Sequence, residues 1–178
     1  MARGLSNNKT TPIALKAMIS QKSKEVFENQ HVLTENELHS RYEVQIEQYV
    51  NKVKIEADLL EEISRTFILP AANEHLNKLG ETYRNLSDMG LKDQAQSVVE
   101  QVTPIADLTK SLNEDLPRLM EAKSAADSIG DAGQRAEAYA AQVKPLFVEV
   151  RSSIDKLEGL VDDKIWPMPK YRELLFLR

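Results

Sequence analysis

Residues 34–67 read TENELHSRYEVQIEQYVNKVKIEADLLEEISRTF, and this stretch carries the strongest structural pattern in the chain. Its apolar residues recur at steps of three and four, the spacing of one face of an α-helix. Thr34 and Glu37 have the Thr-x-x-Glu spacing of a capping box at a helix start. The pattern predicts a helix of about eight turns. Its apolar stripe comprises Leu38, Tyr42, Ile46, Tyr49, Val53, Leu60, Ile63 and Phe67.

Helical patterns continue on both sides of this stretch. A preceding helix is expected from Thr11, as its cap, to about residue 31, and the central helix is expected to continue to Gly90, a residue that favours a helix end. Two more helices are expected over about residues 92–129 and 134–164, separated by the turn SIGDAG. The prolines inside these helices remove backbone donors and predict bends; they are Pro70, Pro104, Pro117 and Pro145. The predicted fold is all-α, an antiparallel bundle of about four long, proline-kinked helices.

Composition excludes several classes of protein. The 178 residues include no cysteine, which removes disulfide scaffolds, zinc fingers, iron–sulfur sites and thiol nucleophiles, and fits the cytoplasm. The net charge of −5 gives no electrostatic basis for nucleic-acid binding. No apolar run reaches the roughly 20 residues that span a bilayer, so no membrane partner is expected. Residues 1–24 are basic and lack acids; we interpret them as a solvated helix face rather than a transit peptide, because the helix pattern continues past them.

Motifs that carry chemistry are missing from the sequence. There is no glycine-rich phosphate loop and no serine-hydrolase elbow. A dinuclear metal site in a helix bundle needs two Glu-x-x-His motifs, and only Glu28 with His31 has that spacing. His39 lies four residues from an acidic residue on either side, an arrangement common on helix surfaces, and His75 belongs to no such motif. We therefore predict no catalytic, cofactor-binding or metal-binding residue.

The C-terminal stretch WPMPKYRELLF, residues 166–176, is stiff and apolar where most chain ends are polar. The prolines restrict the backbone to extended conformations, and each aromatic ring can bury about 150–250 Å². The tail either packs on its own bundle or docks on another part of a larger assembly. The interface candidates are Trp166, Pro167, Pro169, Tyr171, Leu174, Leu175 and Phe176.

The same tail carries a family resemblance. KLEGLVDDKIWPMPKYRELLF, residues 156–176, resembles the C-terminus of type III glutamine synthetases, with Met168 where that family has leucine. Residues 3–38 resemble the last stretch of the family's catalytic domain, and residues 37–60 its long helix after the catalytic barrel. Residues 138–158 fit the segment before the tail, whereas residues 85–135 diverge.

The resemblance implies a noncatalytic C-terminal helical domain of an ATP-dependent glutamate–ammonia ligase. Residues 1–33 would be the end of the parent's catalytic domain, and residues 34–178 a helical bundle with a docked aromatic tail. The parent's ATP and its Mg or Mn would bind upstream, since no position here matches a catalytic motif of the family. The implied partners are the rest of the parent chain and neighbouring subunits of a homo-oligomer. The alternative is a free-standing helical adaptor that binds a protein partner through the Leu38–Phe67 stripe.

Overall fold

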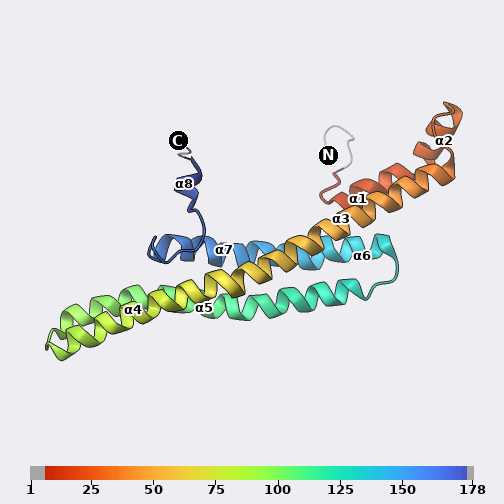
Figure 1. Ribbon diagram of the computed structural model, residues 1–178. Coiled ribbons are helices and arrows are strands. Elements are labelled where there is room, and N and C mark those ends of the chain that lie inside the picture. Colours follow the sequence, from red (N-terminus) through yellow and green to blue (C-terminus); the bar gives the residue numbers. More distant parts are fainter. Residues whose placement is uncertain (1–6, 176–178) are drawn as a thin grey trace. The chain divides into compact units, whose positions relative to one another are not determined.

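The computed structural model describes residues 7–175, except for the side chains of Tyr171 and Arg172. This part of the chain is helical and contains no strand, which confirms the predicted all-α class (Figure 1). In chain order the elements are α1 (Thr11–Lys16), the 3₁₀ turn η1 (Ala17–Ile19), α2 (Gln21–Asn29), α3 (Glu35–Ile63), the π segment η2 (Ser64–Ile68), α4 (Leu69–Asp88), α5 (Lys92–Asp127), α6 (Ala132–Ala138), the π segment η3 (Tyr139–Val143), α7 (Lys144–Leu160) and α8 (Tyr171–Leu175).

Contacts divide the chain into two compact units, each with its own core. Unit 1 comprises the residues up to Ala57 together with Leu119–Pro145, and unit 2 comprises Asp58–Arg118 and the residues from Leu146 onward. The core of unit 1 includes Leu38, Tyr42, Ile46, Val50, Val53, Leu119, Ala136, Tyr139 and Val143. The core of unit 2 includes Ile68, Ala72, Val98, Ile105, Leu112, Leu116, Val150, Leu157 and Trp166. The two units are defined by contacts within this chain. The boundary predicted between residues 33 and 34 separates domains of a longer parent protein, and it stays a prediction.

The caps of the long helices follow from the sequence. The Thr34 backbone N–H donates to Glu37 Oε2 at 2.8 Å, and the Glu37 backbone N–H donates to Thr34 Oγ1 at 3.3 Å, so the predicted capping box is confirmed. The backbone N–H and the hydroxyl of Thr34 both donate to the Glu37 carboxylate and hold its pKa below its ordinary value. At the end of α4, Gly90 has φ 79° and the Leu91 N–H bonds the carbonyl of Leu86, which is the bond pattern of a Schellman stop.

The first predicted helix is interrupted, which corrects the sequence-based expectation. Thr10, not Thr11, occupies the N-cap position of α1, and its side chain makes no capping bond. After η1, Ser20 is extended and caps α2 by accepting from the Ser23 N–H at 3.3 Å. Serine is a favoured N-cap residue. A new helix therefore begins after Ser20, where the periodic pattern alone predicted that the first helix would continue.

The apolar stripe of α3 also differs from the prediction at its C-terminal end. Leu38, Tyr42, Ile46 and Val53 are buried as expected. Further along, however, Val50, Ala57, Ser64 and Ile68 form the buried line, whereas Phe67 is 51% exposed. The prediction favoured the larger side chains, but the buried line here also includes the small residues Ala57 and Ser64.

A π segment precedes two of the four prolines at which the sequence predicts bends, and the bends themselves stay a prediction. Pro70 follows η2 and Pro145 follows η3 at the same spacing. The residue before each proline donates its N–H to the carbonyl five residues back, Leu69 to Ser64 and Lys144 to Tyr139. This wider turn removes the collision between a proline ring and the carbonyl four residues back. Pro104 and Pro117 lie inside the uninterrupted α5.

Candidate interface at the C-terminal tail

Trp166 and Lys170 anchor the start of the tail in unit 2. Trp166 is 6% exposed, and the Lys170 ammonium lies 6.0 Å from its ring centre. Lys170 Nζ donates to the carbonyl of Val161 at 2.8 Å and pairs with Asp163 at 2.7 Å. The Lys170 ammonium thus gives a donor to the carbonyl of Val161, just past the end of α7, and its positive charge interacts favourably with the helix dipole. The root of the tail therefore packs on its own unit.

The rest of the tail lies on the surface as far as the structure describes it. Pro167 and Pro169 are exposed, and in α8 Leu174 is 54% and Leu175 is 70% exposed. The side chain of Tyr171 and all of Phe176 lie outside the described residues. The root of the tail thus packs on its own unit, whereas Leu174 and Leu175 of α8 are exposed. Their role at an interface stays a prediction.

An apolar groove lies in the same unit, between α5 and α7. Pro104 and Leu108 on α5, with Gly159 and Leu160 on α7, supply its apolar lining. Asp107, Asp155 and Lys156 supply the charged side chains around it. The groove has a volume of about 560 Å³. Gly159 has no atom within 4 Å of the position where a Cβ would stand, so its missing side chain keeps this part of the groove open.

A second hollow, in unit 1, runs along the N-terminal half of α3. Met18 of η1 and Val44 of α3 give it apolar surface, and Ser40, Arg41 and Gln48 give it polar groups. Val44 is 51% exposed. Met18 falls within residues 1–33, which the resemblance predicts to be the end of a parent's catalytic domain, and the other lining residues fall within the predicted bundle.

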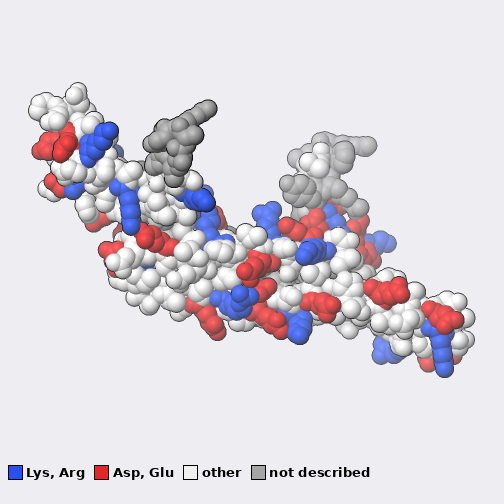
Figure 2. Space-filling model, turned by 180° about the vertical axis from the view of Figure 1, so that it is seen from behind, with Lys and Arg blue, Asp and Glu red and all other residues white. Residues whose placement is uncertain are grey.

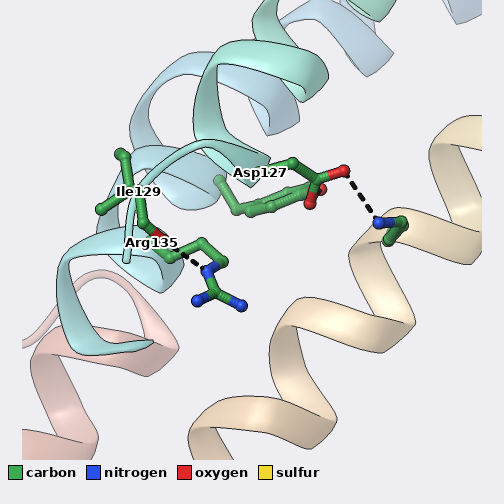
Figure 3. A network of polar contacts seen from close by, with 5 residues as sticks. Asp127, Ile129 and Arg135 are labelled. Carbon is green, nitrogen blue, oxygen red and sulfur yellow. Dashed lines mark hydrogen bonds and ion pairs between the residues drawn. The ribbon is translucent and has the colours of Figure 1, made fainter. Parts of the chain in front are cut away.

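A polar network in unit 1 holds the turn between α5 and α6 (Figure 3). Arg135 Nε donates to the carbonyl of Ile129 at 2.9 Å, which fixes the loop. Asp127, the last residue of α5, accepts from Lys54 Nζ at 2.8 Å and from the Tyr139 hydroxyl at 2.7 Å. Burial acts to raise the pKa of Asp127, but the hydrogen bonds from Lys54 and Tyr139 outweigh it and hold the pKa below its ordinary value. This carboxylate is engaged in structural contacts.

The three histidines occupy separate positions. His31 has φ 52° and closes α2 in a Schellman pattern, in which its N–H bonds the carbonyl of Glu28. His39 Nδ1 lies 3.4 Å from Glu43 on the surface of α3. His75 is on α4, and its Nδ1 is buried without a hydrogen-bond partner among the described residues. In the part of the chain that the structure covers, no three acidic or histidine side chains are grouped as metal ligands would be.

The surface charges are mixed in sign. Figure 2 shows acidic and basic side chains interspersed over one face, without a large area of either sign. Among residues 7–175, no helix combines the length and the apolar content that a bilayer-spanning segment requires.

Comparison with known proteins gives a family match over the first part of the chain. Residues 1–87 match the model of the family described as Glutamine synthetase C-terminal domain. These residues belong to that family. A glutamine synthetase of Bacteroides fragilis (strain YCH46) is 31% identical over 183 residues, covering 99% of this chain and 25% of the relative. A type-3 glutamine synthetase of Dictyostelium discoideum is 33% identical over 181 residues, with 99% and 25% covered. A glutamine synthetase of Butyrivibrio fibrisolvens is 28% identical over 180 residues, with 98% and 25% covered.

The match to glutamine synthetases thus extends over nearly the whole chain, although the chain spans about a quarter of the length of the curated relatives it matches. The glutamine synthetase C-terminal family model ends within α4, at residue 87. The groove and the tail lie beyond it, but they fall inside the alignments to the relatives. The resemblance read from the sequence is confirmed at the level of the family.

Proposed function

We propose that the chain is the noncatalytic C-terminal helical domain of a type III glutamine synthetase and that it supports assembly of the homo-oligomer. The observation that carries this proposal is the alignment of 99% of the chain to only 25% of each of two glutamine synthetases. The three remaining quarters of such an enzyme have ample length for the catalytic sites. The parent enzyme would work in the cytoplasm.

The local chemistry of the described carboxylates supports a noncatalytic role. Phosphoryl transfer needs clustered metal-binding carboxylates and cationic clamps. Here Glu37 is held in a capping box, Asp127 by Lys54 and Tyr139, and Asp162 by the backbone N–H of Lys164. Each is satisfied by its own neighbours and each lies on a different part of the chain. ATP and the divalent metal of the parent would be bound by the segments outside this chain.

Exposed apolar side chains support the assembly role. In unit 1 Val44 borders the hollow beside Met18. In unit 2 Phe67 on η2 and the leucines of α8 are at least half exposed. The rest of the parent chain and its neighbouring subunits are the partners proposed for these exposed side chains.

The alternative function is an adaptor that binds a partner through the Leu38–Phe67 stripe, but much of this stripe is buried in the structure. Leu38, Ile46 and Val53 are buried in the core of unit 1 and are not available to a partner. Only Phe67, at the far end of the stripe, is widely exposed. The buried part of the stripe, from Leu38 to Val53, is therefore a packing surface within the chain.

The proposal is tested by removing this region from a whole enzyme. In the Bacteroides fragilis relative, we expect deletion of the aligned C-terminal quarter to reduce the sedimenting mass of the enzyme to that of smaller assemblies. The isolated 178-residue chain should form no glutamine from glutamate, ammonia and ATP. An intact oligomer after the deletion would refute the assembly role, and turnover by the isolated chain would refute the noncatalytic role.

A further inference from the structure

We propose that the chain has a hinge where it passes from unit 1 to unit 2, and that Pro117 and Pro145 are its hinge residues. The chain makes this passage at three points, each inside a helix: at residues 57–58 in α3, 118–119 in α5 and 145–146 in α7. Units with separate cores are expected to move relative to each other unless a large apolar interface holds them. The inference concerns a motion of this chain alone, so it does not rest on the proposed role in assembly.

Prolines coincide with two of the three passages. Pro117 lies two residues before the first residue that α5 contributes to unit 1, and Pro145 is the last residue of unit 1 before α7 continues in unit 2. A proline has no N–H, so it leaves a carbonyl of the preceding turn without its usual helical donor. The hydrogen bonding of both helices is therefore weakened close to the points where they change unit.

The π segment before Pro145 adds to this weakness. η3 replaces a regular helical turn by a wider one, a form at which helices commonly bend. The matching segment before Pro70, η2, lies within unit 2, and there the hydroxyls of Ser64 and Thr66 donate to carbonyls of the preceding turn at 2.6 Å and 2.7 Å. η3 reads YAAQV and has no serine or threonine to make such bonds. We therefore expect η3 to bend more readily than η2.

The side chains around the two prolines are suited to a hinge. Fully buried residues, one from the core of each unit, flank each proline: Leu116 and Leu119 around Pro117, and Val143 and Val150 around Pro145. Both prolines are exposed, so neither is fixed by the packing of a core. Each helix is thus anchored on both sides of an exposed proline, and a bend there can reorient the units while both cores stay closed.

The third passage, in α3, supplies the pivot of the hinge. α3 contains no proline and continues as a regular helix through residues 57 and 58. Just before the passage it is held to unit 1, because Lys54 Nζ donates to Asp127 Oδ2 at 2.8 Å and Ala57 is fully buried. The proposed motion is therefore a bend of α5 and α7 about an intact α3, and the two units stay joined throughout.

The absence of cysteine from the chain permits a direct test with spin labels. Ser124→Cys on α5 in unit 1 and Arg151→Cys on α7 in unit 2 are labelled in the whole chain, and double electron–electron resonance measures the distribution of distances between them. Both positions are exposed. We expect a broad distribution whose width falls about twofold when Pro117→Ala and Pro145→Ala are added, because alanine returns the N–H that each helix lacks. The exposed prolines leave no cavity on replacement, and circular dichroism checks that the helix content is kept.

Two controls make the test specific to the hinge. Pro70→Ala replaces the proline after the other π segment, inside unit 2, and should leave the width between positions 124 and 151 unchanged. Labels at Lys110→Cys and Arg151→Cys lie in the same unit, and their distribution should be narrow with all prolines in place. This second comparison tests the hinge without any substitution of proline.

Three results would overturn the inference. They are a distribution between positions 124 and 151 as narrow as the one within unit 2, a width that the paired alanine substitutions leave unchanged, and an equal narrowing by Pro70→Ala. Each of these results would leave the deletion test of the assembly role unaffected.

Discussion

The hydroxyl of Tyr139 donates to Oδ1 of Asp127 at 2.7 Å, which ties the start of the π segment η3 to the last residue of α5. Lys54 Nζ reaches Oδ2 of the same carboxylate at 2.8 Å from α3. One side chain thus joins three helical segments of unit 1. Because this contact is polar and Tyr139 is fully buried, its loss should be visible in stability.

Replacing Tyr139 with phenylalanine removes the hydroxyl and keeps the ring. We expect the Tyr139→Phe chain to lose about 1 kcal/mol in its free energy of unfolding, measured by urea denaturation, because Asp127 loses the hydrogen bond from the Tyr139 hydroxyl. The pKa of Asp127 should rise in this variant. Tyr83→Phe, at a partly exposed position, is the control and should change stability little. A result in which both variants behave alike would contradict a role for the hydrogen bond.

The lowered pKa of Asp127 predicts a pH dependence whose sign follows from linkage. In the unfolded chain Asp127 takes up its proton near its ordinary pKa of 3.8. In the folded chain its pKa is lower, so the carboxylate is protonated only at a lower pH. The stabilisation is therefore complete above that value and is lost as the pH falls through the folded pKa. We expect Asp127→Asn to be less stable than the parent at pH 7 and its disadvantage to shrink below about pH 4. A constant difference at pH 7 and pH 3 would argue against this assignment.

The left-handed backbone at His31 predicts a stabilising substitution. Glycine adopts φ near 52° without the steric cost that histidine has there. His31→Gly should raise the free energy of unfolding by about 0.5–1 kcal/mol, measured by thermal or urea denaturation. His39→Gly, inside α3, should lower it by about 0.5–1 kcal/mol, because glycine weakens a helix interior. A destabilised His31→Gly chain would show that the imidazole makes a contact that outweighs the backbone gain.

The buried ammonium of Lys170 predicts that the tail contributes to the stability of unit 2. Lys170→Met keeps most of the stem but leaves the Val161 carbonyl without its donor. We expect a loss of about 2 kcal/mol in the free energy of unfolding, as is usual for charged hydrogen bonds. Lys164→Met, on the exposed surface of the same loop, should cost little. Hydrogen exchange at the end of α7 should accelerate only in the Lys170 variant.

Local signals made much of the helical framework predictable. The capping box at Thr34 and Glu37, the stop at Gly90 and the turn around Gly130 each depend on residues close in sequence, and the structure confirms all three. The resemblance of the tail likewise pointed to the family that the comparisons show.

Features decided by competition between contacts were harder to predict. The break at Ser20 depends on a cap outweighing helix continuation, and the exposure of Phe67 depends on a seam of small residues such as Ala57 and Ser64. The anchoring of Lys170 joins residues from two segments that periodicity does not relate. Composition alone distinguishes the tail from the rest of the chain. Which of its residues are buried at the root and which leucines are exposed depends on how the tail packs on unit 2, and only the structure shows this.

The π segments bear on how these helices tolerate insertions and deletions. In an ordinary helix one residue more or less rotates everything downstream by about 100° and turns the packed face away. A π segment absorbs one additional residue locally, so Ser64–Ile68 and Tyr139–Val143 are places where length can vary while the downstream faces keep their orientation. Because Pro70 and Pro145 favour the wider turn, shortening either segment would be best tolerated together with replacement of its proline.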